Sequence, residues 1–218
     1  MATSTERPDD VAYLLPLFEA VAPYRADGHF RQLPEPAPRS SLATDDNPLN
    51  HYGSSYLIRT SFAAGLLHID ALRRLVIDSR QIDPASPWTL LRGALENFST
   101  SVWLLCGKDR SERRARALAL WDEDMRNRDQ HETDVQHVVT GQGKSGAQRR
   151  QEVQQLATTL GLDPLPGGKA GFIIAAAAPE AGLDPVSVRA SWRVAPGFAH
   201  GRFWPNLRAA QAQRDTHR

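Results

Sequence analysis

Cysteine is almost absent from this sequence, since Cys106 is the only one among 218 residues. A single cysteine forms no intrachain disulfide and cannot build a thiolate zinc site. Disulfide-stapled and zinc-finger folds are therefore excluded, and a chain of this length can bury an adequate core without such links. We expect a protein of the reducing cytoplasm.

Long apolar runs are also missing. No stretch approaches the roughly 20 apolar residues that a membrane helix requires, and the polar N-terminal stretch MATSTERPDD does not resemble a signal peptide. Convincing pairs of segments with alternating apolar and polar residues are absent as well. The sequence therefore predicts an all-α protein with no membrane partner.

An excess of one charge is lacking over the whole chain but not over its end. The net charge is only +1, which argues against a protein that is basic all over. From Val186 onward the sequence has one acidic residue, Asp215, and six arginines: Arg189, Arg193, Arg202, Arg208, Arg214 and Arg218. This segment carries +5 and leaves −4 for the rest. Such an end suits RNA or another phosphate-bearing ligand, although a solvated tail has the same composition.

The clearest helical pattern lies in residues 87–105, and we expect the rest of the chain to pack around it. Large apolar side chains recur there at alternating steps of three and four, a spacing that places them on one side of a helix: Trp88, Leu91, Leu95, Phe98, Val102 and Leu105. A second long helix is predicted over residues 49–81. The short turn between them favours an antiparallel pair at the centre of a helical bundle.

The other segments complete one predicted domain over residues 9–205. Residues 1–8 are expected to be disordered, residues 31–48 to form a proline-rich surface connection without regular structure, and residues 206–218 to form a basic tail. Further helices are predicted over residues 109–139 and 147–160. A small apolar helix is predicted to end at Pro179, and a last helix to run from Asp184 through Ala195. Because the central helix is apolar on more than one side, we expect a homodimer.

Two polar pairs are candidates for a site. Arg193 and His200 lie seven positions apart in SWRVAPGFAHGRFW, so a helix would direct both from one face, with Pro196 and Gly197 between them. Arg92 and Glu96 lie one turn apart on the shoulder of the central helix, and Arg202 adds a further cation. Each pair also has a purely structural interpretation, as a brace or as an ordinary ion pair.

An arginine followed after six residues by a histidine on a late helix resembles the signature of the HEPN superfamily, whose compact helical domains include many toxin and phage-defence ribonucleases. The Arg92 and Glu96 pattern is similar to that of allied, uncharacterised bacterial all-helical families. The resemblance implies metal-independent RNA cleavage at a site completed across a two-fold dimer. It assigns the scissile phosphate to Arg193 and proton transfer to His200, with no cofactor and no metal.

Two alternatives stay open. In the first, the protein is a non-catalytic helical binding or scaffold protein in which Arg193 and His200 are structural. In the second, a small-molecule or metal-dependent enzyme uses the acidic half-helix of residues 122–137, where Asp134 and His137 have half of a di-metal motif. A solvated, salt-bridged face explains that half-helix better. Cys106 is predicted to be a buried, inert thiol.

Overall fold

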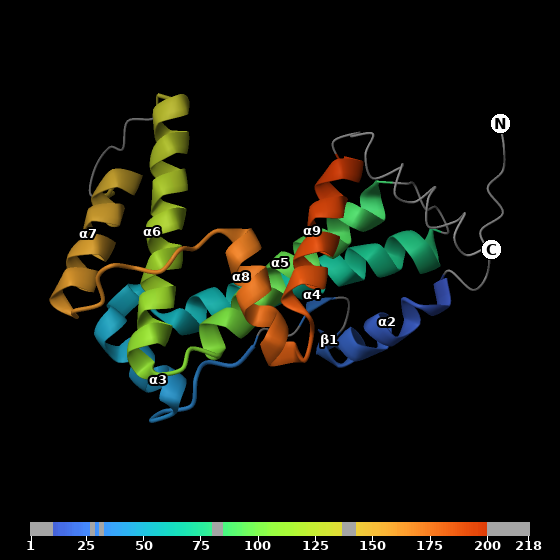
Figure 1. Cartoon of the computed structure of the whole chain (residues 1–218), viewed down its shortest axis with the longest axis horizontal. Coiled ribbons are helices and arrows are strands. Elements are labelled where there is room, and N and C mark those ends of the chain that lie inside the picture. The colour runs from blue at the N-terminus through green and yellow to red at the C-terminus, as the bar shows by residue number, and fades with distance from the viewer. Residues whose placement is uncertain (1–10, 27–28, 31–32, 80–84, 137–142, 200–218) are drawn as a thin grey trace.

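The structure is a computed structural model that describes residues 11–26, 29–30, 33–79, 85–136 and 143–199 (Figure 1). Helices dominate it, which confirms the all-α prediction. The helices are α2 (Leu15–Val21), α3 (Ser41–Asp46), α4 (Ser54–Arg73), α5 (Ser86–Leu105), α6 (Arg110–Asp134), α7 (Gly146–Thr159), α8 (Ala170–Ala177) and α9 (Pro185–Ala199). The two strands, β1 (Arg25–Ala26) and β2 (His29–Phe30), have two residues each and pair antiparallel. Along the described residues, every helix is too short or too polar to span a lipid bilayer.

The predicted antiparallel pair, α4 with α5, forms the centre of the bundle. Two glycines allow the helices to approach closely, because a methyl group at Gly65 would lie 2.7 Å from the ring of Phe98, and one at Gly93 would lie 2.5 Å from the ring of His68. Near the other end, the hydroxyl of Ser101 donates to the backbone oxygen of Ile58 at 3.3 Å. The pair is thus in contact along its length.

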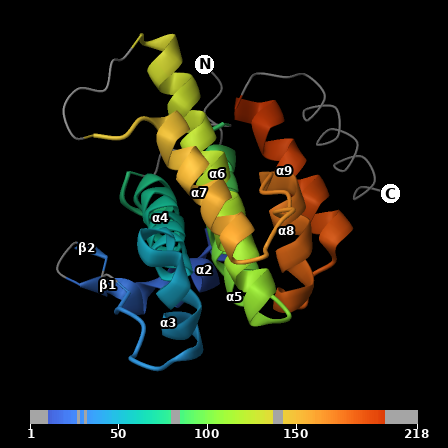
Figure 2. The same cartoon turned by 90° about the vertical axis from the view of Figure 1, so that its left-hand side faces the viewer.

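The remaining helices cover the central pair on different sides. Helices α8 and α9 lie against α5, whereas α2 crosses α4 (Figure 2). Helices α6 and α7 pack side by side at one end of the molecule. The buried apolar residues fall into two clusters, one centred on Trp103 and Leu118 and the other on Leu66 and Leu72. Helix α5 contributes residues to both clusters, as expected of a helix whose apolar surface is wider than one face.

The start of α4 differs from the prediction of a helix over residues 49–81. Residues Asn47–Tyr52 form a 3-10 helix with Asn50 at a φ of 54°, and Gly53 is extended, so the α-helix begins only at Ser54. A carboxylate oxygen of Asp46 accepts from the backbone N–H of Ser54 at 2.6 Å. Asp46 therefore caps α4 from across the intervening 3-10 helix. At its other end, α4 continues as a π-helical turn, Arg74–Asp78.

The proline-rich segment also contains a regular element that the prediction excluded. Helix α3 lies within residues 31–48 and begins after Pro38. The side chain of Ser40 caps it by accepting from the backbone N–H of Ala43 at 3.2 Å. Six residues do not form a stable helix alone. Arginines from α6 hold α3 in place by binding the buried Asp45. Tertiary contacts therefore stabilise this helix in addition to its local sequence.

Helix α6 begins as predicted but is shorter than expected. Asp109 caps it by accepting from the backbone N–H of Glu112 at 2.8 Å, and it ends at Asp134 instead of Val139. Its polar half packs on the polar helix α7, where Arg150 Nε donates to an oxygen of Asp122 at 3.1 Å. The salt-bridged interpretation of this half-helix therefore fits the described contacts.

Replacing Phe98 with alanine is expected to lower the free energy of unfolding by about 3 kcal/mol, the lower end of the range for buried phenylalanine. Its ring fills the space above Gly65 and packs edge-on to Phe62, with centroids 5.5 Å apart. Urea denaturation measures the loss. Leu105→Ala on the same helix is the control, since Leu105 is 50% exposed, and it should change stability by less than about 0.5 kcal/mol. Equal losses in the two variants would contradict this packing.

Candidate functional site

Arg193 lies on the outer side of α9. The helix begins at Pro185, and Asp184 caps it by accepting from the backbone N–H of Ser187 at 2.7 Å. Hydrogen bonds from Ser187 hold the pKa of Asp184 below its usual value. The side chain of Arg193 is exposed and forms no ion pair with any other residue that the structure describes. It is therefore available to an anionic ligand.

Trp192, the neighbour of Arg193, points inward and joins α9 to α5. Its indole N–H donates to Oε1 of Glu96 at 2.6 Å, and Arg92 Nε donates to the same oxygen at 2.7 Å. The Arg92 guanidinium also lies over the Trp192 ring, 5.0 Å from its centroid. We call Arg92, Glu96 and Trp192 the α5–α9 brace. Because the brace ties the Trp192 side chain to α5, it fixes the turn of α9 that carries Arg193.

The Arg92–Glu96 pair is partly buried, with side-chain exposures of 30% and 32%. The sequence predicted the pair but not its third member, Trp192, which completes it from nearly one hundred residues away. The close contacts within the brace fit a positioning role for Arg92 and Glu96. The structure thus places this pair beside the Arg193 segment, behind the helix that carries it.

An aromatic pair lies farther along the same two helices. Trp88 of α5 and Phe198 of α9 are stacked, with ring centroids 5.0 Å apart and planes tilted by 13°. Trp88 keeps 37% of its surface exposed. Sequence reasoning used Trp88 only as part of the apolar stripe and did not pair it with Phe198. The signal that could have suggested this pair is the density of aromatic residues in SWRVAPGFAHGRFW.

Other predicted site residues fall beyond the described part of the chain. His200 and Arg202 lie outside it, as does the basic tail of residues 206–218. Helix α9 is regular up to Ala199, with Pro196 inside it. The structure therefore describes Arg193 and the brace, whereas the relation between Arg193 and His200 stays a prediction.

The acidic half-helix gathers no metal site within the described ranges, where no group of three or more histidine, cysteine or acidic side chains is arranged to hold an ion. Several of its carboxylates are instead paired with arginines. Arg128 Nε donates to Glu132 at 2.7 Å, and Arg126 pairs with Glu123. The cluster of acidic and histidine ligands that a metal-dependent enzyme would require is thus not seen in this part of the chain.

Cys106 corrects one prediction, because its side chain is exposed and not buried at the end of α5. Partial desolvation, together with the nearby carboxylate of Glu180, raises the pKa of its thiol. A raised pKa leaves less thiolate at neutral pH, and the thiolate is the nucleophile. The expectation of an unreactive thiol is therefore retained for an electrostatic reason and not because the thiol is covered.

No protein-family model, no curated protein and no solved structure matches this chain. Its function must accordingly be argued from its own residues.

Proposed function

We propose that the protein is an RNA-acting protein and a metal-independent endoribonuclease whose site includes Arg193 of α9 and His200. One observation carries the proposal: Arg193 is exposed, has no ion-pair partner among the residues that the structure describes, and stands on a helix that the α5–α9 brace fixes to the core. An exposed guanidinium on a helix that is fixed to the core suits the binding of phosphate, to which it can donate two parallel hydrogen bonds. Arg189, one turn earlier on the same helix, adds a second cation.

In the proposed reaction, the 2′-hydroxyl of RNA attacks the adjacent phosphorus, and the bond to the 5′-oxygen of the next nucleotide breaks. The products are a 2′,3′-cyclic phosphate and a 5′-hydroxyl. Arg193 stabilises the charge that builds on the phosphoryl oxygens. His200 moves a proton from the 2′-hydroxyl or to the leaving oxygen, because the usual pKa of histidine lies near neutrality.

The exposed face of Trp88 supports a single-stranded substrate. Unpaired bases stack on aromatic side chains with little dependence on sequence, whereas bases within a duplex are already stacked. Trp88 is held by its own stacking on Phe198, close to the C-terminal end of α9. An aromatic platform near phosphate-binding cations is the usual composition of a surface that binds single strands.

The brace also favours the rival function, a helical scaffold in which this region only stabilises the fold. Arg92, Glu96 and Trp192 satisfy one another, so they do not require a ligand. The two functions differ in what they expect of Arg193. A scaffold protein would neither bind nor cut RNA, and substitution of a structural Arg193 would lower the stability of the fold as bracing hydrogen bonds are lost.

Arg193→Ala is expected to weaken binding of single-stranded RNA by about tenfold, because a guanidinium–phosphate contact is typically worth about 1–2 kcal/mol. Fluorescence anisotropy with a labelled oligonucleotide measures the affinity at several salt concentrations. The loss should shrink as salt rises, and the salt dependence itself should become less steep.

The matched control is Arg126→Ala, because Arg126 is an exposed arginine on α6 that pairs with Glu123. It should leave RNA affinity unchanged within about twofold, the scale of a distant screened charge. Equal losses of RNA affinity in both variants would mean that RNA binds through general electrostatic attraction and not at Arg193. An absence of RNA binding by the unmodified protein would reject the proposed function.

A further inference from the structure

A hollow lies between the first turns of α4 and the middle of α6, and a residue of α5 also lines it. Its volume is about 380 Å³, which is within the range of about 300–1,000 Å³ that small-molecule sites occupy. Because three helices contribute to it, its shape is set by the packing of the bundle. We call it the α4–α6 hollow, and the residues that carry its chemistry are Tyr56, Thr60, Thr100, Trp121 and Asp124.

Aromatic rings form one wall of the α4–α6 hollow. The rings of Tyr56 and Trp121 are stacked, with centroids 5.7 Å apart and planes tilted by 22°. Tyr52 packs edge-on against Trp121, with centroids 5.5 Å apart. Tyr52 is itself buried, and its hydroxyl donates to Oε2 of Glu152 in α7 at 2.8 Å. The Trp121 ring is therefore held in place, whereas Tyr56 is 57% exposed and accessible to a ligand.

The charge of the α4–α6 hollow is negative. Asp124 lines it with an exposed side chain, and its carboxylate has no ion pair and no hydrogen bond with any other residue that the structure describes. Glu123 also lines it, but Arg126 neutralises that charge by pairing with it. No lysine, arginine or histidine belongs to the described lining, and the neighbouring Arg59 of α4 pairs with Glu35. One carboxylate of the hollow is therefore left without a cation.

The hydroxyl groups of the hollow add hydrogen-bond acceptors. The hydroxyl of Thr100 donates to the backbone oxygen of Glu96 at 2.8 Å. Since a hydroxyl has a single proton, only its lone pairs remain for a ligand. Thr60 contributes a second hydroxyl from the exposed side of α4. A carboxylate, hydroxyl lone pairs and aromatic faces together favour a positively charged donor.

We propose that the α4–α6 hollow binds a small organic cation, an ammonium group carried on a flat apolar body. The ammonium pairs with the carboxylate of Asp124, and the apolar body lies against the ring of Tyr56. An anion would instead meet Asp124 without a compensating cation. A metal ion would lack ligands, because no group of three or more acidic, histidine or cysteine side chains is arranged to hold one within the described part of the chain.

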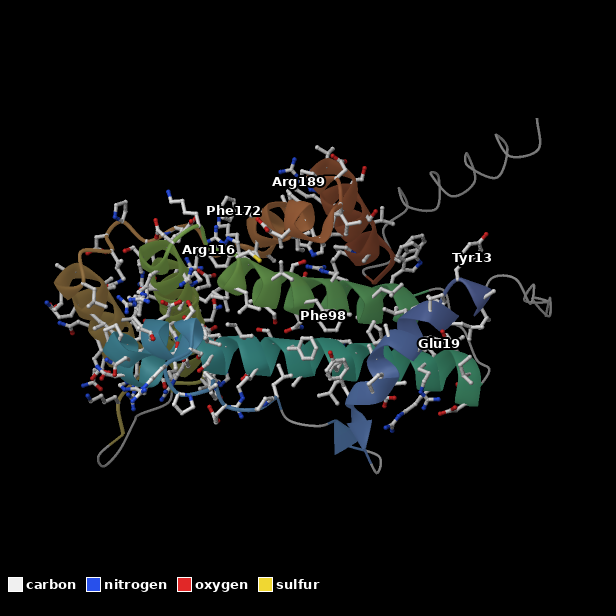
Figure 3. The ribbon with its side chains drawn as sticks, turned by 90° about the horizontal axis from the view of Figure 1, so that it is seen from below. Tyr13, Glu19, Phe98, Arg116, Phe172 and Arg189 are labelled. Atoms are coloured by element: carbon white, nitrogen blue, oxygen red, sulfur yellow. The ribbon has the colours of Figure 1, made fainter. Side chains whose placement is uncertain are left out.

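This site is independent of the proposed RNA function. Figures 2 and 3 place α5 between α4 and α9, so the α4 wall of the hollow is separated from Arg193 by the central helix. A cation bound beside Asp124 leaves the surface of α9 free for phosphate. Failure of either proposal would therefore leave the other standing.

Phenethylamine is the probe for the site, because it carries an ammonium group on a benzene ring. It is titrated into the unmodified protein while heteronuclear NMR follows the indole N–H resonances. The Trp121 resonance should shift and saturate with a dissociation constant of about 1 mM, the affinity expected of so small a ligand. The Trp192 resonance, from α9, should not move. A Trp121 resonance that stays in place or shifts without saturation would overturn the proposal.

Hydrocinnamate is the matched probe, because it has the same ring and the same two-carbon chain with a carboxylate in place of the ammonium. It should bind at least about tenfold more weakly, since attraction to Asp124 is replaced by repulsion. Equal affinity of the unmodified protein for the two probes would refute the assignment of a cation site.

Asp124→Asn tests the carboxylate. It should weaken phenethylamine binding by about fivefold, the upper range for an exposed ion pair, and it should reduce the preference for phenethylamine over hydrocinnamate. Asp134→Asn is the control, because Asp134 is an exposed acid on the same helix that accepts from Gln130 at 2.9 Å. It should leave both affinities unchanged. An unaltered preference in Asp124→Asn would contradict the proposed pairing.

Tyr56→Ala tests the aromatic wall. It should weaken both probes alike, by about fivefold, because each loses contact between its ring and the phenol ring. Circular dichroism checks that this substitution of an exposed side chain leaves the fold intact. Tyr56→Phe keeps the ring and removes only the hydroxyl, so it should bind both probes as the unmodified protein does. Unchanged binding by Tyr56→Ala, or an equal loss in Tyr56→Phe, would count against the site.

Discussion

His200→Ala is expected to slow the cleavage of single-stranded RNA by about 10²–10⁴-fold, the usual contribution of one general acid or base. The reaction should proceed in EDTA, because the proposed mechanism needs no metal ion, and its products should carry a cyclic phosphate. Imidazole has the right pKa for both proton transfers, and alanine removes it without adding a new group. Quenched single-turnover reactions on a labelled oligonucleotide measure the rate.

Stability measured on the same variant separates the two functions considered for this chain. A histidine that transfers protons contributes little to folding, so the melting temperature of His200→Ala should stay within about 2 °C of the unmodified protein, which corresponds to at most about 1 kcal/mol. The scaffold hypothesis expects the reverse, with no RNA cleavage by either protein and a lower melting temperature as bracing contacts are lost. That second pattern would end the nuclease proposal.

Asp45→Ala should lower the free energy of unfolding by about 3 kcal/mol, the largest stability effect that we expect of any single charge. Asp45 is 1% exposed, and it accepts from Arg113 Nε at 2.6 Å and from Arg110 Nε at 3.0 Å. Arg114 binds the backbone oxygen of the same residue at 3.0 Å. Loss of the carboxylate would leave the Arg113 guanidinium, only 19% exposed, without its ionic partner.

The expected loss is at the lower end of the range for buried pairs because Arg110 is 51% exposed and water can solvate it. Asp78→Ala is the matched control. Asp78 also pairs with an arginine, Arg73, at 2.9 Å, but its side chain is 55% exposed, so the change should cost less than about 1 kcal/mol. Chemical denaturation of both variants measures the difference. Similar small losses would mean that the arginines of α6 do not hold α3.

Helix identity was accessible from the sequence because it depends on local chemistry. The apolar period of α5 and the caps Asp109 and Asp184 act within one or two turns, and the structure contains all three features. The antiparallel pairing of α4 with α5 followed from the short connection between two long apolar stripes. The all-α class was predictable for the same reason.

Contacts between distant segments were not accessible, because nothing in the local pattern specifies a partner. The brace needs Trp192 to meet Glu96, and the buried Asp45 of α3 binds arginines more than sixty residues later. Arg193 was a candidate by sequence, but its exposure depends on the tertiary placement of Trp192 beside it. The sequence by itself determined the helices and nominated the charged side chains. The tertiary structure decided which of those charges brace the fold and which face solvent, because that choice depends on packing between helices.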